Sequence, residues 1–323
     1  MLYAALKGRS STVDARAAVD AQATSMSERR RLPERGHCAP AFGRMLIPRA
    51  HGASLRDFRT HFADHKTPAG FAHFGLRTLS SKGMETSGAR TLNLTKQEFL
   101  ESVLRLEPRV AAFDCDGTLW SGDAGERFFD WEIKQGVVTD EVARAMRARY
   151  AEYKAGRVSE DEMCGEMVTM HNGIAETTMM EAAADFMERA FPGKIFIEMQ
   201  ELVKRLQENG CEIWAVSSSN EWVIRTGMKA FGISEDRILA TKVELDNGVI
   251  TDRLVRIPSG PGKPKALRDV VKKEIDAAFG NSRWDADMLG IARHGFAVNP
   301  NPDLEAAARQ RGWTIYFPDG TAR

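Results

Sequence analysis

An apolar run that ends in two carboxylates constrains the fold of this chain more than any other stretch. Val110 to Phe113 are apolar, and the sequence Asp-Cys-Asp-Gly-Thr follows at positions 114–118. This pattern predicts a buried parallel strand whose carboxyl end opens into a polar turn. Ligands of open α/β sheets bind at that edge. Asp-x-Asp-Gly also occurs in ordinary turns and in calcium loops, but a calcium loop needs more oxygen ligands, whereas Leu119 and Trp120 follow here at once.

The charge balance favours a small-molecule partner. The 323 residues suffice for one large or two modest domains, and the 45 basic and 45 acidic side chains cancel. No overall field therefore favours nucleic acid or an anionic membrane.

We see no apolar run long enough to cross a bilayer and no signal peptide, and we expect a cytoplasmic protein. Four scattered cysteines lack zinc spacing and are expected to be reduced: Cys38, Cys115, Cys164 and Cys211.

Residues 1–88 differ in composition from the rest. They are rich in Arg, Ser, Ala and His, poor in acids, and without a sustained apolar period. We expect a poorly ordered extension, with Met84 as the favoured true start and an organelle-targeting transit peptide as the alternative. His61 and His65 have the spacing of a helical metal pair, but no helical pattern surrounds them, so we expect no metal site there.

Strands alternate with helices after this extension. Apolar runs expected to form strands lie at positions 110–113, 212–216, 238–240, 277–279, 295–298 and 313–317. Helical periods lie at 92–106, 221–231 and 265–273, and a further helix stops at Gly210. A hairpin over 242–254 is expected to turn about Asp246-Asn247-Gly248. The alternation predicts an α/β fold with a doubly wound parallel sheet.

A purely helical region interrupts the alternation directly after the first strand. Thr139 or Asp140 can cap one of its helices, and Ser159 with Glu162 forms a capping box before another. We therefore expect a small helical insert over residues 121–192. The α/β core would then consist of residues 89–120 and 193–323.

Polar side chains follow several of the expected strands, or lie in the loops beside them. They are Asp114, Asp116, Ser217, Lys263, Asn281 and Asp285. The carboxyl ends of parallel strands share one edge, so these side chains could meet there. Ser217 could instead cap the following helix, and Lys263 could be a solvated loop lysine. A P-loop is excluded, because the required pattern fails at Ile257 and Pro264.

The order of these motifs resembles the haloacid dehalogenase superfamily. The matching motifs are Asp-x-Asp-Gly-Thr, an apolar strand ending in Ser, Gly-Lys-x-x-x-Leu, and Gly-Asn-Ser-x-x-Asp, between about Val110 and Phe317. The helical insert looks like the C1 cap of the phosphoserine phosphatase-like branch. The resemblance implies that Asp114 is a nucleophile that forms an aspartyl-phosphate, and that Asp116 is the general acid and base.

The resemblance also implies how the phosphoryl group and a metal are held. Lys263 would bind phosphoryl oxygens and steady Asp114, with Ser217, Ser218 and the backbone near Gly117 hydrogen-bonding the same oxygens. Mg²⁺ would be held by Asp114, the Asp116 backbone carbonyl and the fourth motif, Asn281 and Asp285. Asn281 stands where many relatives have an Asp and supplies no charge, so more of the binding would fall to Asp285.

The expected function is that of a Mg²⁺-dependent phosphomonoesterase acting on a small phosphorylated metabolite. The resemblance implies phosphate ester hydrolysis and not dehalogenation, because the dehalogenases of the superfamily lack the second acid that Asp116 provides. A phosphomutase and a non-catalytic phosphate-binding regulatory protein are the alternatives. The sequence assigns no oligomeric state.

Candidate substrate residues follow the first motif. Asp123 and Glu126 lie near where serine phosphatases of this type place a carboxylate for the substrate amine. Trp120, Phe128 and Trp131 could instead form an aromatic face for a quaternary ammonium such as that of phosphocholine, or simply pack the insert. Phosphoserine-like and phosphocholine-like substrates both stay open at this point.

Overall fold

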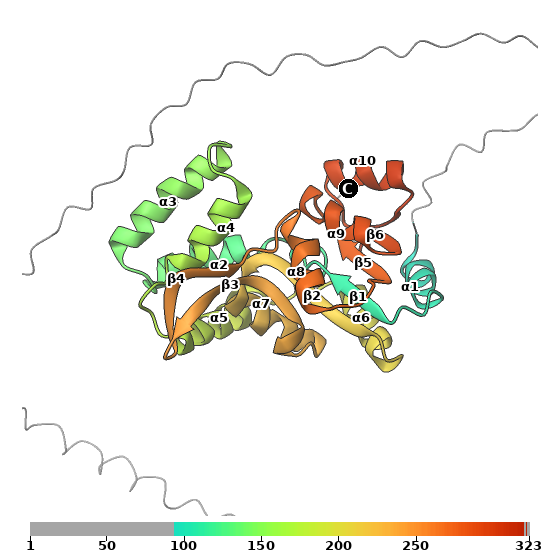
Figure 1. Ribbon diagram of the computed structural model, residues 1–323, viewed down its shortest axis with the longest axis horizontal. Coiled ribbons are helices and arrows are strands. Elements are labelled where there is room, and N and C mark those ends of the chain that lie inside the picture. Colours follow the sequence, from blue (N-terminus) through green and yellow to red (C-terminus); the bar gives the residue numbers. More distant parts are fainter. Residues whose placement is uncertain (1–93, 320, 322–323) are drawn as a thin grey trace, which may run out of the picture. The chain divides into compact units, whose positions relative to one another are not determined.

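The computed structural model describes residues 94–319 and residue 321, shown in colour in Figure 1. Contacts divide the chain after Ser81, and all described residues belong to the second unit, Lys82–Arg323. The expectations for residues 1–88, including His61, His65 and Met84, lie outside the described residues, as does Cys38.

A seven-stranded sheet forms the centre of this unit. Its order is β4-β3-β2-β1-β5-β6-β7, and every neighbouring pair is parallel except β3 and β4. The strands are β1 Val110–Phe113, β2 Glu212–Asn220, β3 Ile238–Asp246, β4 Val249–Arg256, β5 Ala277–Gly280, β6 His294–Val298 and β7 Thr314–Tyr316. The short apolar β1 lies in the middle, so its carboxyl end is flanked by those of β2 and β5. The predicted doubly wound α/β fold is confirmed.

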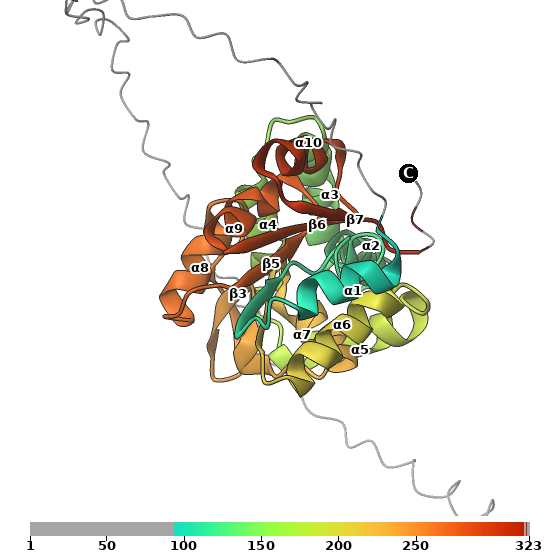
Figure 2. The ribbon, with the colours of Figure 1, turned by 90° about the vertical axis from the view of Figure 1, so that its right-hand side faces the viewer.

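Six helices cover the two faces of this sheet (Figure 2). Their bounds are α1 Lys96–Leu104, α6 Ile197–Glu208, α7 Glu221–Met228, α8 Gly262–Val270, α9 Ala286–Ile291 and α10 Pro302–Arg311. Alternate β1 residues point to opposite faces: Phe113 packs in the cluster with α1, α6 and α7, and Ala112 in the cluster with α8, α9 and α10. Burial on both faces explains why β1 is a continuous apolar run.

Four further helices lie between β1 and α6 in the chain. They are α2 Ala124–Gln135, α3 Asp140–Lys154, α4 Glu160–Thr169 and α5 Glu176–Ala190. Thr139, not Asp140, caps α3, and Ser159 with Glu162 forms the predicted capping box of α4. A separate apolar cluster that includes Phe129 and Met163 joins α2, α3 and α4, which lie near the β3–β4 hairpin in Figure 1. No helix among the described residues is long and apolar enough to span a membrane.

Two strand predictions were too short. β2 continues through Ser217–Ser219 to Asn220, and the Asn220 side chain, not that of Ser217, caps α7 by accepting from the Val223 N–H at 3.0 Å. β3 runs without a break from Ile238 to Asp246. The expected turn at Asn247-Gly248 is confirmed, since both residues have positive φ, as a two-residue hairpin turn requires.

The position of Lys263 also differs from the prediction. Lys263 lies in the first turn of α8, which begins at Gly262 and not at Lys265. Pro264 made this segment look like a loop, yet proline is tolerated in a first helical turn because the N–H there has no helical partner. The helix start therefore fixes where Lys263 points.

Asp276 joins the beginnings of β1 and β5. Its buried carboxylate accepts hydrogen bonds from the Arg109 N–H at 2.9 Å and the Val110 N–H at 3.1 Å.

We expect Asp276→Ala to lower the free energy of unfolding by about 1–3 kcal/mol, because it leaves buried N–H donors without an acceptor. Urea denaturation measures this. Asp269→Ala, which removes an exposed carboxylate paired with Lys265, should change stability by less than about 0.5 kcal/mol; equal losses would contradict the account.

Candidate active site

A buried lysine connects two carboxylates at the carboxyl edge of the sheet. The Lys263 Nζ lies 2.6 Å from Asp114 Oδ1 and 2.6 Å from Asp285 Oδ1, and it donates to the Val216 carbonyl at 3.1 Å. Lys263 is 2% exposed and Asp285 1%. Asp114 follows β1, Asp285 ends the short 3₁₀ turn Arg283–Asp285 after β5, and Lys263 comes from α8. The structure therefore brings together two residues that the sequence placed at strand ends and one, Lys263, that it placed in a loop.

The two carboxylates keep this lysine charged. Burial alone would lower the pKa of Lys263, but the adjacent Asp114 and Asp285 outweigh it, and the net pKa is raised. For Asp114, burial and then the charge of Asp285 raise the pKa to about 6, while Lys263 and Thr118 act in the opposite direction. With both carboxyls ionised, the Lys263, Asp114 and Asp285 side chains together carry a net negative charge.

Thr118 and Gly117 shape the turn after Asp114. The Thr118 hydroxyl donates to Asp114 Oδ2 at 2.6 Å, an orienting role that the sequence reasoning did not assign although Thr118 is part of the first motif. Gly117 has a φ of 77°, and a Cβ there would lie 1.8 Å from the Asn281 Nδ2. Only glycine allows the Asn281 amide to pack this closely on the turn.

Asp116 is the second centre of the site. Its Oδ1 accepts from the Trp120 Nε1–H at 2.7 Å and from the Ala124 N–H at 2.6 Å, and its Oδ2 accepts from the Ser219 hydroxyl at 2.7 Å. Burial, followed by the charge of Asp123, raises the pKa of Asp116 to about 7 despite these hydrogen bonds. A carboxyl with this pKa can both give and take a proton near neutrality. Ser219 is a functional candidate that the sequence reasoning missed, because a third consecutive serine carries no pattern of its own.

Asp285 of the fourth motif, which was expected to carry much of the metal binding, is engaged in hydrogen bonds within the protein. Asp285 Oδ2 accepts from the Asn281 and Ser282 N–H groups, each at 2.9 Å, and from the Ser282 hydroxyl at 3.2 Å. With Oδ1 bound to Lys263, this carboxylate mainly positions the lysine and the turn. Its role as a metal ligand stays a prediction, one that this hydrogen bonding does not favour.

The predicted Mg²⁺ ligands fit that ion in the kind of atom they offer. Among the described residues, no three His, Cys, Asp or Glu side chains converge as a metal cluster. The predicted donors are instead an Asp114 carboxylate oxygen, the Asp116 backbone carbonyl and the Asn281 amide oxygen, and the Asn281 side chain packs on Gly117. These are hard oxygen donors, and Mg²⁺ sites commonly combine one or two carboxylates with waters and substrate phosphate. The donor set is therefore compatible with Mg²⁺ and carries little charge.

The predicted phosphate-binding serines lie on the last residues of β2. The Ser217 hydroxyl accepts from the Ser219 N–H at 3.1 Å and is 1% exposed, so it steadies the strand end. Ser218 lines a pocket, and its carbonyl accepts from the Thr241 hydroxyl at 2.6 Å. Phosphate binding by either serine stays a prediction.

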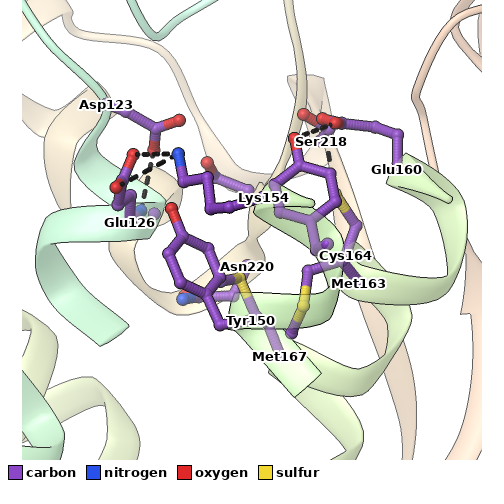
Figure 3. Close-up of a pocket in the computed structure, with 13 residues that line it drawn as sticks. Asp123, Glu126, Tyr150, Lys154, Glu160, Met163, Cys164, Met167, Ser218 and Asn220 are labelled. Atoms are coloured by element: carbon purple, nitrogen blue, oxygen red, sulfur yellow. Dashed lines mark hydrogen bonds and ion pairs between the residues drawn. The ribbon is translucent and has the colours of Figure 1, made fainter. Parts of the chain in front are cut away.

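A pocket opens between β2 and the helices that follow β1 (Figure 3). Its lining residues are Asp123, Gly125, Glu126, Tyr150, Tyr153, Lys154, Glu160, Met163, Cys164, Met167, Ser218, Ser219 and Asn220. Two of the predicted substrate residues, Asp123 and Glu126, are therefore in the pocket. Of the lining residues, Ser219 donates to the Asp116 carboxylate and Gly125 packs against Ser219.

The aromatic face expected from Trp120, Phe128 and Trp131 does not form. Trp120 and Phe128 are fully buried, and Trp131 stacks on Phe128 at 5.9 Å. The Trp120 ring packs edge-on against Phe191, while its Nε1–H holds Asp116. These rings fill the core beneath the pocket, which is the packing alternative considered above, and the pocket's aromatic residues are Tyr150 and Tyr153.

Comparison with known proteins agrees with this geometry. A model of the haloacid dehalogenase-like hydrolase family matches residues 111–290. The chain belongs to this family. Among curated relatives of this hydrolase, the histidinol-phosphatase of Neisseria meningitidis serogroup C (strain 8013) is 25% identical over 217 residues, covering 64% of this chain and 97% of the relative.

Two further comparisons agree with this assignment. Phosphoserine phosphatase SerB1 of Mycobacterium tuberculosis is 23% identical to the hydrolase over 216 residues, covering 64% of this chain and 70% of that relative. A solved structure of a protein of unknown function from Bordetella pertussis Tohama I superposes with a TM-score of 0.58 at 21% identity, covering 64% of this chain and 97% of that one. This last likeness shows the fold.

Gly125 controls the distance between α2 and Ser219. A Cβ at Gly125 would lie 2.3 Å from the Ser219 Oγ, so Gly125→Ala must displace the hydroxyl that orients Asp116. We expect Gly125→Ala and Ser219→Ala each to lower kcat about ten- to a hundred-fold, because small displacements of catalytic groups are costly. Steady-state kinetics on a generic phosphate ester measures this. Gly290→Ala in α9, where a new Cβ meets only the flexible end of Arg311, should keep full activity; an equal loss there would contradict the assignment.

Proposed function

We propose that this hydrolase is a Mg²⁺-dependent phosphomonoesterase that acts through an aspartyl-phosphate. The observation that carries the proposal is the pairing of the Lys263-bound carboxylate of Asp114 with a second, independently held carboxyl at Asp116. Asp114 Oδ1 accepts a hydrogen bond from the Lys263 ammonium, which would also attract a phosphoryl group. No lysine pairs with Asp116 among the described residues, and the pKa of Asp116 is raised to about 7. The two carboxyls therefore differ in environment, as a nucleophile and an acid/base require.

The proposed reaction has two steps. An Asp114 oxygen attacks phosphorus, the bond from phosphorus to the ester oxygen breaks, and the Asp116 carboxyl gives its proton to the departing alcohol. Asp116 then takes a proton from water, which attacks phosphorus and releases inorganic phosphate and the Asp114 carboxylate. Lys263 offsets negative charge in both steps without changing its own protonation, since Asp114 and Asp285 hold its pKa high.

The proposed metal site consists of Asp114, the Asp116 carbonyl and Asn281. When bound there, Mg²⁺ would offset the charge of the phosphate dianion, which otherwise meets a net negative group. The packing of Asn281 on Gly117 supports this assignment, because it places the amide against the turn that follows Asp114 and Asp116.

The proposed substrate is a small phosphate ester with a cationic group, such as a phosphoserine- or phosphocholine-like compound. Helices α2–α5 would act as the cap that selects it. The pocket supports this, because it carries Asp123, Glu126 and Glu160 against a single lysine, Lys154. Two relatives are named for phosphoserine and histidinol phosphate, which both carry an amine.

Asp114→Asn tests the proposed nucleophile. We expect it to abolish phosphate release from p-nitrophenyl phosphate and from small esters, because an amide is a poor nucleophile toward phosphorus. Circular dichroism should show an unchanged fold. Asp130→Asn, at an exposed carboxylate near Arg147, is the matched control and should keep wild-type activity. Retained turnover in Asp114→Asn would refute the covalent route, and isomerisation of a sugar phosphate without phosphate release would favour a phosphomutase.

Asn281→Asp tests the proposed metal site. The added carboxylate should tighten Mg²⁺ binding about ten-fold or more, because Mg²⁺ prefers charged oxygen ligands. The readouts are the Mg²⁺ concentration for half-maximal activity after chelation and the rise in melting temperature with Mg²⁺. Asn172→Asp, on an exposed turn after α4, should change neither. Unchanged Mg²⁺ dependence in Asn281→Asp would place the metal elsewhere.

A further inference from the structure

A positive charge already lies in the pocket beside the active site (Figure 3). The ammonium of Lys154, the last residue of α3, is 5.0 Å from the centroid of the Tyr150 ring and 5.8 Å from that of Tyr153. The same Nζ lies 3.4 Å from each carboxylate oxygen of Glu126. Two aromatic rings and a carboxylate around one point form a site for an ammonium or quaternary ammonium group.

The rings of this site are held by carboxylates at their outer ends. The Tyr153 hydroxyl donates to Glu160. Burial, and then a hydrogen bond to Glu126, raise the pKa of Tyr150. Both phenols therefore stay neutral, and hydrogen bonds to carboxylates keep their rings electron-rich. The rings and carboxylates together favour a cation over an anion.

Lys154 itself is held loosely. Its side chain is 54% exposed and that of Glu126 is 41% exposed. Ion pairs this exposed contribute little to stability, because water and salt screen them. Another cation with a firmer attachment to the site could therefore displace the lysine at little cost.

Ser219 connects this site to the proposed catalytic centre. Ser219 lines the pocket and donates to Asp116 Oδ2 at 2.7 Å. Gly125, in the first turn of α2, lies next to both Ser219 and Asp123, because a Cβ on it would be 2.3 Å from the Ser219 Oγ and 3.3 Å from an Asp123 carboxylate oxygen. The alcohol that Asp116 protonates would thus extend from Asp116 toward the two tyrosines.

We propose that Tyr150, Tyr153 and Glu126 bind the cationic group of the substrate's leaving alcohol, and that the Lys154 ammonium occupies its place until the substrate displaces it. This proposal rests on the proposed phosphatase function and names its substrate class, phosphate esters of alkylammonium alcohols. It makes Lys154 a competitor, which limits affinity for cationic substrates.

Two esters of the same shape test the proposal on the full-length enzyme with Mg²⁺. Phosphocholine carries a quaternary nitrogen where 3,3-dimethylbutyl phosphate carries a neutral carbon. Selectivity is the ratio of their kcat/KM values. The wild type should favour phosphocholine about three- to thirty-fold, the range expected from a cation–π contact. A wild-type ratio near one would overturn the proposal.

Variants separate displacement from a general charge effect. Lys154→Met should raise the selectivity up to about five-fold through a lower KM for phosphocholine, since the lysine gives up only an exposed ion pair and its contacts with the two rings. Combining it with Tyr150→Leu and Tyr153→Leu should remove that gain and bring the ratio near one. Lys204→Met, which removes an exposed lysine near Glu208 on α6, is the matched control and should behave as wild type.

The remaining outcomes each have one meaning. Unchanged or lowered selectivity in Lys154→Met would overturn the proposal, and so would a gain that persists without the tyrosine rings. If the leucine variants do not fold, as judged by thermal melting, the wild-type and Lys154→Met ratios decide alone. Phosphate release from both esters at equal efficiency leaves the phosphatase function intact and overturns only this proposal. No release from either ester or from p-nitrophenyl phosphate would overturn both.

Discussion

The placement of one buried ammonium between two buried carboxylates is the constraint on which the rest of the structure depends. Lys263 contacts Asp114, Asp285 and the Val216 carbonyl, so it joins groups that follow β1 and β5 to a carbonyl within β2. Without it, two carboxylates would face each other away from water, at a cost that buried unpaired charges make large. The central position of β1 and the start of α8 at Gly262 both serve to bring these groups together.

Asp116 connects this core to the inserted helices. Its carboxylate accepts from Trp120, from the first turn of α2 and from Ser219 on β2, so one side chain links three segments. Asp116, which is proposed to exchange protons with the substrate, therefore also holds α2 and Ser219, and both of these contribute residues to the pocket. This coupling explains why the residue at position 125 must be small: a Cβ there meets the Ser219 hydroxyl before anything else.

The sequence predicted the parts of this arrangement that depend on local patterns. An apolar run followed by Asp114 and Asp116, and a Gly-Asn-Ser turn before Asp285, placed carboxylates at strand ends. The parallel sheet then required them to meet. The sequence pattern placed Lys263 wrongly in a loop, because Pro264 suggested a loop where α8 in fact begins, at Gly262. It also missed Ser219 and overvalued Trp120, because the direction of a side chain at a strand end or after a turn depends on packing partners far away in the chain.

The account's central claim is that Asp114 itself receives the phosphoryl group. The most direct measurement is mass spectrometry of peptides from an Asp116→Asn variant that is quenched in acid during reaction with p-nitrophenyl phosphate, whose leaving group departs without a proton from Asp116. Without Asp116 to activate water, the account predicts a hydroxylamine-labile phosphoryl adduct on the peptide containing Asp114, absent when Asp114→Asn is added. Continued phosphate release with no adduct at Asp114, or an adduct on another residue, would contradict it.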